Sequence, residues 1–154
     1  MRRLPIVLFS LLAACAPAAQ TRPDGPAPAE PTTMAAPAGG IMGSYTVTLA
    51  ASDLPAGMPP QAQSRAVGTW GLAFHEGNHF VVTHEGRQVI EGPYRAVGDR
   101  LMFATGESGP YACNTPATYT WRTNNRQTTF TPVGADPCPG RALALTTRPY
   151  TRAP

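Results

Sequence analysis

Apolar and polar residues alternate along the chain from residue 43 onward, in short runs rich in Val, Thr, Tyr, Phe and Trp. A period of two residues with this composition predicts β-strands that have one apolar face. No stretch shows a sustained 3.6-residue apolar period, so we expect no long helix. The pattern predicts eight strands, at residues 43–50, 67–75, 79–84, 87–96, 100–106, 117–123, 126–132 and 141–150.

Four of the connections between these strands are short and have the chemistry of tight turns. Gly77, Gly86, Gly98 and the pair Asn124-Asn125 are residues that adopt positive φ easily, as hairpins require. Alternation along the strands then defines one apolar face. That face, which we expect to point inward, comprises Tyr45, Val47, Leu49, Trp70, Leu72, Phe74, Phe80, Val82, His84, Leu101, Phe103, Tyr119, Trp121, Phe130, Leu143 and Leu145.

A sheet of sequential hairpins keeps exposed edges unless it closes on itself, and eight strands are a natural number for closure. We therefore predict an all-β, eight-stranded antiparallel up-and-down barrel over residues 43–152, with a two-sheet sandwich as the alternative. In such a barrel the connections 51–66, 85–86, 107–116 and 133–140 share one end. Three of these four are long, whereas all connections at the other end are tight. The sequence thus predicts one loop-covered mouth and one closed bottom.

Four short segments carry a family resemblance, and they are Gly43-Ser44-Tyr45, Gly68-Thr69-Trp70, Glu91-Gly92-Pro93-Tyr94 and Asp136-Pro137-Cys138-Pro139-Gly140-Arg141. On the barrel plan described above, they make the domain similar to the lipocalin-like (calycin-type) domains of bacterial lipoproteins. Lipocalins have Gly-x-Trp on the first strand and a late arginine stacked over that tryptophan. This chain departs from that pattern, because its Gly-x-Trp falls on the second predicted strand and its first strand offers Tyr45 instead.

The first residues have the parts of an export signal: two arginines, an apolar run over residues 4–12 and small residues before Cys15. The apolar run is shorter than the about 20 residues that span a bilayer. Residues 12–15, Leu-Ala-Ala-Cys, resemble the bacterial lipobox, which implies removal of a signal peptide at 1–14 and acylation of Cys15, palmitate included. An ordinary signal peptide with an incidental cysteine is the alternative.

Acylation of this kind would make the membrane a partner of the chain, because two or more acyl chains give stable anchoring. In a bacterium with two membranes, alanine at position 16 resembles the outer-membrane sorting class, so we expect a lipid-anchored protein of the cell envelope. Residues 15–42 are mostly Ala, Pro, Thr and Gly, with few charges. Such a segment buries too little apolar surface to fold, and we expect a disordered linker.

Charge argues against a nucleic-acid partner. The chain has 12 basic residues, all arginine, and 9 acidic residues. Arg2 and Arg3 leave with the signal peptide, so 12 − 2 = 10 arginines remain against the 9 acids. No basic cluster remains that could follow a phosphate backbone.

Cys113 and Cys138 are the two cysteines that remain once Cys15 is acylated. Both lie in long loops of the predicted mouth, and an exported compartment permits disulfides. We therefore predict a disulfide between them, worth roughly 3 kcal/mol in the chain-entropy description. A metal or redox pair is the alternative, but there is no Cys-x-x-Cys spacing to support it.

The sequence shows no sign of catalysis, of a cofactor or of a metal site. The serines lack a Gly-x-Ser-x-Gly context, and no His-Glu-x-x-His is present. His75 and His79 flank one turn without a clear third ligand, so we interpret them as polar turn residues. Glu91 is the one carboxylate within a predicted strand, and it has no identifiable partner. We expect a protein that is not an enzyme.

We expect the barrel to bind a small apolar ligand at its mouth, with loop 51–66 as a lid and both domain termini at the opposite end. The alternative is a filled barrel without a ligand that acts as a structural or protein-interaction module of the envelope. Eight inward aromatic side chains keep that alternative open. The residues expected to contact a ligand are Leu49, Trp70, His84, Phe103, Tyr119 and Leu143.

Overall fold

The computed structural model describes residues 40–154. The predicted signal peptide, Cys15 and most of the predicted linker lie outside the described residues. The elements are β1 (Gly43–Leu49), a short 3-10 helix η1 (Ala51–Asp53), α1 (Pro60–Ala66), β2 (Gly68–His75), β3 (His79–His84), β4 (Arg87–Val97), β5 (Arg100–Phe103), β6 (Ala117–Asn124), β7 (Gln127–Pro132), α2 (Pro139–Thr146) and β8 (Tyr150–Arg152).

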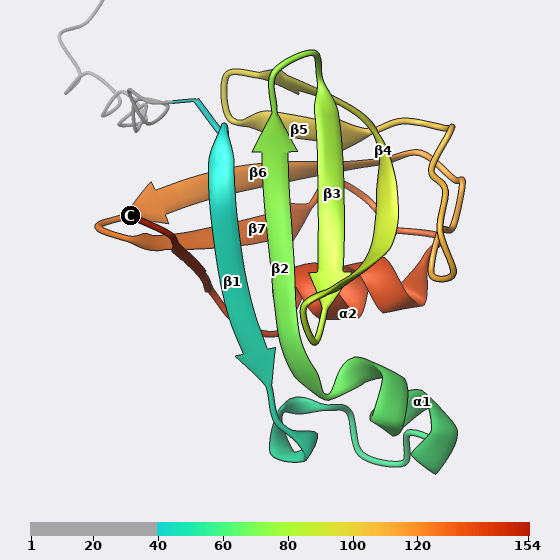
Figure 1. Cartoon of the computed structure of the whole chain (residues 1–154). Helices are drawn as coiled ribbons and strands as arrows, with labels where there is room; N and C mark the ends of the chain where they lie inside the picture. Colours follow the sequence, from blue (N-terminus) through green and yellow to red (C-terminus); the bar gives the residue numbers. More distant parts are fainter. Residues whose placement is uncertain (1–39) are drawn as a thin grey trace, which may run out of the picture. The chain divides into compact units, whose positions relative to one another are not determined.

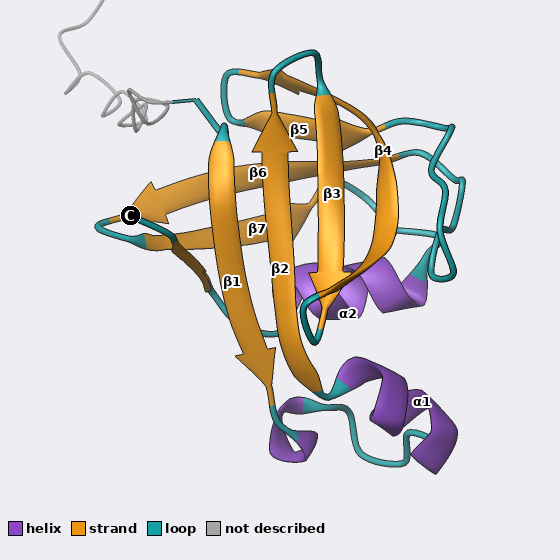
Figure 2. Ribbon diagram, in the orientation of Figure 1, coloured by secondary structure: helices purple, strands orange, loops and turns teal. Residues whose placement is uncertain are grey.

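The eight strands form one closed barrel in which every strand is antiparallel to the next along the chain (Figures 1 and 2). β8 closes the barrel by pairing with β1, with Tyr45 opposite Arg152. The predicted up-and-down barrel is therefore confirmed. Seven of the eight predicted strands match observed strands, with ends that differ by one residue or, for β5, by three.

The predicted strand at 141–150 is wrong over most of its length. Residues Pro139–Thr146 form helix α2, and β8 begins only at Tyr150. Leu143 and Leu145 alternate with smaller residues as a strand would, but Arg, Ala and Leu are all strong helix formers. Pro139 occupies the first turn, where proline favours a helix start. Two leucines are too few to distinguish the 3.6-residue period of a helix from the two-residue period of a strand.

Aromatic side chains fill the barrel between the strands. The eight aromatic residues predicted to point inward are all buried, and the rings of Phe74 and Tyr94 and of Phe80 and Phe103 meet edge to face, 4.8 and 5.0 Å apart. Such contacts add to the free energy of burial. The barrel wall therefore encloses a packed core rather than a channel.

Both termini of the described chain lie at the same end of the barrel. The Tyr45 hydroxyl donates to the Ile41 carbonyl at 2.8 Å, and the Ala153 amide donates to the Ser44 carbonyl at 2.8 Å. Ile41 is itself buried, so packing begins two residues before β1. Among the described residues, we find no helix that is long and apolar enough to cross a membrane.

Helices α1 and α2 lie at the opposite end, where β1 ends and β2 begins (Figure 1). β8 pairs with β7 only at Thr151 and Tyr150, so the ladder between β7 and β8 is short. α2 packs against β7. Two of the three long connections thus contain helices, η1 and α1 after β1 and α2 after β7, and these lie at the end expected for the mouth.

Candidate ligand-binding cavity

A cavity of about 850 Å³ lies at the barrel end that carries the two helices. This volume is within the usual range for small-molecule sites. Core aromatic residues of the barrel, among them Phe80 and Phe103, form its inner end. Its walls come from α1, α2 and the connection between β5 and β6. The apolar and aromatic side chains that line it include Leu49, Pro55, Met58, Trp70, Leu72, Phe80, Val82, Ile90, Phe103, Tyr111, Leu143, Leu145 and Tyr150.

The C-terminal end of α1 is held at the mouth by two aromatic side chains of the barrel. Trp70 Nε1 donates to the Ala66 carbonyl at 2.8 Å, and His84 Nε2 lies 2.9 Å from the Val67 carbonyl. Trp70 and His84 are opposite each other in the β2–β3 register and stack with ring centroids 4.4 Å apart. Carbonyls at the end of a helix need such partners, so the stacked pair positions the lid.

The connection between β5 and β6 forms a second wall by adding itself to the edge of β4. The Ser108 amide donates to the Glu91 carbonyl at 2.8 Å, and the Tyr111 amide donates to the Val89 carbonyl at 3.2 Å. Gly109 has a φ of +112°, and a Cβ there would lie 2.3 Å from the Val89 oxygen. Only glycine fits so close an approach. Tyr111 is thereby fixed at the mouth, with its ring 6.1 Å from those of Trp70 and His84.

The predicted disulfide between Cys113 and Cys138 is present and joins the second wall to the start of α2. Their Cα atoms are 6.1 Å apart. Cys138 is the N-cap residue directly before α2, and both cysteines line the cavity. The bond therefore fixes α2 relative to the β5–β6 connection.

A buried ion-pair network lies beside the disulfide. Arg141 donates to both oxygens of Asp136, at 2.8 and 2.9 Å, and to Glu107 at 2.7 Å. The side chains of Arg141, Asp136 and Glu107 are only 8%, 1% and 2% exposed. The remaining Glu107 oxygen accepts from the backbone amides of Cys113 and Asn114. One arginine thus ties together three segments of the mouth.

The network changes the titration of its members. Burial raises the pKa of the Tyr119 hydroxyl well above its ordinary value, and the hydrogen bond that this hydroxyl donates to Asp136 raises it further. Burial alone would raise the pKa of Asp136, but hydrogen bonds from Arg141, Tyr119 and the Cys138 amide outweigh it and lower that pKa. Asp136 is therefore held as a carboxylate.

The structure places four of the six predicted ligand contacts on the cavity wall, and these are Leu49, Trp70, Phe103 and Leu143. Leu143 reaches the wall from α2 rather than from a strand. The other two lie behind the wall. His84 supports Trp70 and the end of α1, and Tyr119 is fully buried with its hydroxyl on Asp136.

Sequence reasoning missed the polar part of this wall, which comprises Gln61, Arg65, Glu107, Tyr111 and Arg141. All five lie in connections or helices that the strand pattern does not resolve. Arg141 alone had a usable signal, since Asp136 and Arg141 both occur in the segment that carries the family resemblance.

The histidines next to the β2–β3 turn face solvent rather than this cavity. His75 and His79 are opposite each other in the register, and His79 Nε2 lies 3.6 Å from Glu91 Oε2. Within residues 40–154, no three side chains of His, Cys, Asp or Glu come together as metal ligands would. Glu91 itself is at the surface, where it accepts from Gln88 and Ser108.

Comparisons of the chain with protein-family models, with curated protein sequences and with solved structures found no significant match.

Proposed function

We propose that this chain is a membrane-anchored lipoprotein of the bacterial cell envelope whose barrel binds a small apolar ligand at its mouth. The observation that carries the ligand part is the cavity of about 850 Å³. Its lining is mainly aliphatic and aromatic, with a few polar side chains, as in most small-molecule sites. An apolar molecule that enters it gains free energy from the surface it removes from water.

Kinship with lipocalin-like domains is part of this proposal. Arg152, the third residue from the end of the given sequence, lies over the ring of Tyr45 on the first strand, with its guanidinium carbon 5.7 Å from the ring centroid. Arg152 also donates to the Met42 carbonyl at 2.6 Å. A late arginine on an aromatic residue of the first strand is the lipocalin arrangement, with tyrosine in place of tryptophan. This contact supports the kinship.

The filled barrel without a ligand is the second candidate, and the packed aromatic core favours it. The rings of Phe74, Phe103 and Tyr119 are fully buried and pack against one another inside the barrel. The two candidates therefore differ only in whether the space between this core and the helices is occupied.

Calorimetric titration of the chain with decanol separates the two candidates. We expect one saturable site in the wild type. Ala62→Trp places a large side chain on α1 at the cavity wall and should abolish binding, whereas Ala153→Trp at the opposite end should leave it unchanged. Absence of binding in the wild type, or equal binding in Ala62→Trp, would favour the filled barrel.

The anchoring part rests on the lipobox-like residues 12–15, which lie outside the described residues. We expect Cys15→Ser to shift the protein from the membrane fraction to the soluble fraction, because the acyl chains provide the membrane affinity. Cys113→Ser is a control that makes the same replacement at a disulfide cysteine instead, and it should stay with the membrane. If Cys15→Ser still partitions with membranes after a salt wash, the anchoring proposal is wrong.

A further inference from the structure

The polar side chains of the cavity wall divide into two sets. Glu107, Arg141 and Tyr150 already bond within the protein: Glu107 and Arg141 to each other and to the network around Asp136, and Tyr150 through its hydroxyl to the Ala144 carbonyl at 3.2 Å. The other set comprises Gln61, Arg65 and Tyr111. Within the part of the chain that the structure describes, their side chains make no hydrogen bond or ion pair.

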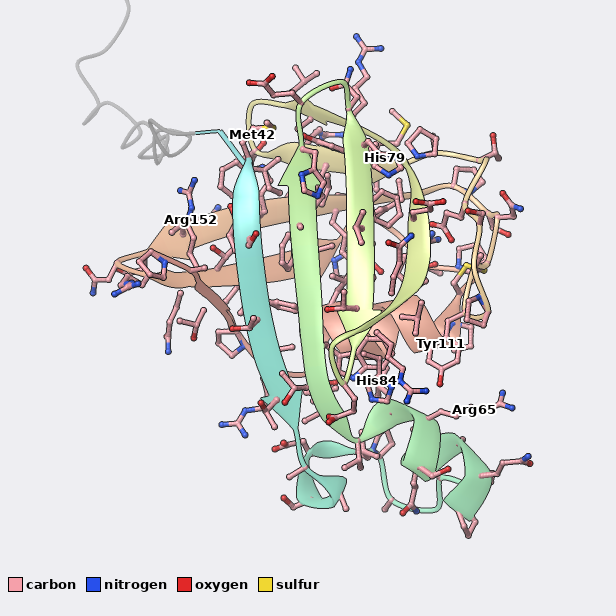
Figure 3. All side chains as sticks on the ribbon, viewed as in Figure 1. Met42, Arg65, His79, His84, Tyr111 and Arg152 are labelled. Atoms are coloured by element: carbon pink, nitrogen blue, oxygen red, sulfur yellow. A yellow bond between two sulfur atoms is a disulfide. The ribbon has the colours of Figure 1, made fainter. Side chains whose placement is uncertain are left out.

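Of the groups in this second set, Arg65 has the only charge. It lies in the last turn of α1, directly before Ala66, whose carbonyl accepts from Trp70. The backbone of Arg65 is therefore fixed at the mouth even though its side chain is exposed. Figure 3 shows Arg65, Tyr111 and His84 together at this end of the barrel. Arg65 and Tyr111 come from α1 and from the β5–β6 connection, which are different walls of the cavity.

The polar groups of the second set, which have no partner within the described protein and face solvent at the mouth, are mostly hydrogen-bond donors, namely a guanidinium, a hydroxyl and an amide. A complementary ligand has to supply acceptors and one negative charge at this place, while the rest of it contacts apolar side chains. A doubly charged phosphate fits less well. The carboxylates of Glu107 on this wall and Asp136 behind it carry two negative charges, and Arg141 neutralises only one of them.

We propose that the ligand is an alkyl monocarboxylate whose alkyl chain lies on Leu49, Leu72 and Phe103 and whose carboxylate binds Arg65 at the mouth, beside Tyr111. This inference rests on the proposed function and specifies its ligand. The alkyl chain replaces water on the aliphatic and aromatic lining. The carboxylate forms a charge-assisted hydrogen bond with the guanidinium, which is stronger than a bond between neutral groups.

The test compares three probes with the same alkyl chain, which are decanoate, decanol and decyltrimethylammonium. Binding to the full chain is measured by calorimetry, with Cys15→Ser in every sample so that no acyl chain competes. We expect decanoate to bind about fivefold more tightly than decanol, because the Arg65 side chain is exposed, and the ammonium probe to bind most weakly. Arg65→Gln should bring decanoate to within about twofold of decanol, and Arg65→Lys should restore part of the difference.

Arg95→Gln is the matched control, because Arg95 is an exposed arginine of β4 that does not line the cavity. It removes the same charge from the whole molecule and should leave the preference for decanoate unchanged. Equal affinities of the wild type for decanoate and decanol, or an unchanged preference in Arg65→Gln, would overturn the inference but leave the apolar site intact. If none of the three probes binds, both the carboxylate inference and the proposed ligand-binding function are wrong.

Discussion

At the scale of single residues, Arg141 links several segments of the mouth through its buried guanidinium. Its guanidinium lies 5.5 Å from the centroid of the Phe103 ring, on the core, while its nitrogens bond Asp136, Glu107 and the Thr115 carbonyl. Burying charges is costly unless every group has a partner. Here the bidentate bond to Asp136 and the bond to Glu107 provide the partners, so the network is sensitive to the loss of any member.

Arg141→Met should destabilise the fold by about 3–5 kcal/mol at neutral pH, because it leaves two buried carboxylates without their cation. Arg148→Met is the control. Arg148 pairs with Asp53 at 3.3 Å but is 53% exposed, so its loss should cost about 0–1 kcal/mol. Chemical denaturation of both variants measures the difference. Equal effects would contradict the role assigned to Arg141.

Acid should reduce the difference between the wild type and Arg141→Met. The pKa of Asp136 in the folded protein lies below its ordinary value of 3.8, so its carboxylate stabilises the fold above pH 3.8 and loses this effect as the pH falls through the lowered pKa. In Arg141→Met, burial of Asp136 is less compensated and its carboxyl takes up a proton at higher pH. Denaturation curves between neutral pH and pH 3 test this, and a constant difference would contradict it.

At the scale of elements, α1 depends on a single contact region. Ala66 is its only buried residue, and the Trp70 indole and the His84 imidazole meet the carbonyls at its C-terminal end. The N-terminal half of α1 has no such contact in the described structure. Elements with few buried contacts open at low free-energy cost, so α1 is suited to act as a lid.

Trp70→Phe should loosen α1 without disrupting the barrel. Phenylalanine keeps an aromatic ring against His84 but lacks the N–H that bonds the Ala66 carbonyl, a loss of about 1–2 kcal/mol. Hydrogen exchange should become faster in residues 62–67 and remain unchanged in β5 and β6. Uniformly faster exchange across all strands would show that Trp70 supports the core instead of the lid.

The sequence predicted the strands far better than the helices, for a physical reason. A strand in a closed barrel has one buried face along its whole length, so residues such as Tyr45, Val47 and Leu49 give a regular period. α1 and α2 are short and each touches the barrel over a narrow area, as the single buried residue of each, Ala66 and Leu145, shows. Two turns of helix do not contain enough apolar positions to reveal their period.

The candidate site was predictable only in its apolar part. Leu49, Trp70 and Phe103 belong to strands, whose register follows from hairpin turns. Arg65 and Tyr111 belong to segments whose position depends on long-range contacts, such as the contact of His84 with the Val67 carbonyl and the pairing of the β5–β6 connection with β4. Neither contact leaves a pattern in the local sequence.

At the scale of the whole molecule, the barrel divides into a packed end and a cavity end. Both termini of the described residues lie at the packed end, with Arg152 between Met42 and Tyr45. Figure 3 shows Met42, His79 and Arg152 in the other half of the barrel from Arg65 and Tyr111. On the proposed anchoring through Cys15, the chain joins the barrel at the packed end and the mouth is free to face away from the membrane.

Alkali should unfold the whole barrel cooperatively. Burial raises the pKa of Tyr45, Tyr94, Tyr119 and Tyr150 above the ordinary value of 10.0. These hydroxyls remain protonated in the folded state but ionise in the unfolded chain, so stability is unaffected below pH 10 and falls as the pH rises above it. Tyrosinate absorbance should rise together with the loss of circular dichroism. Gradual ionisation of all tyrosines with the fold intact would contradict the packed core.

The central claim is that an apolar ligand occupies the space between the aromatic core and the two helices. The most direct measurement is a nuclear magnetic resonance titration of the isotope-labelled full chain, carrying Cys15→Ser, with decanoate. The account predicts saturable shifts in Leu49, Ala62, Trp70 and Leu143, with Met42, Arg152 and Ala153 at the packed end unchanged. Shifts that do not saturate, or that are absent from α1 and α2, would contradict it.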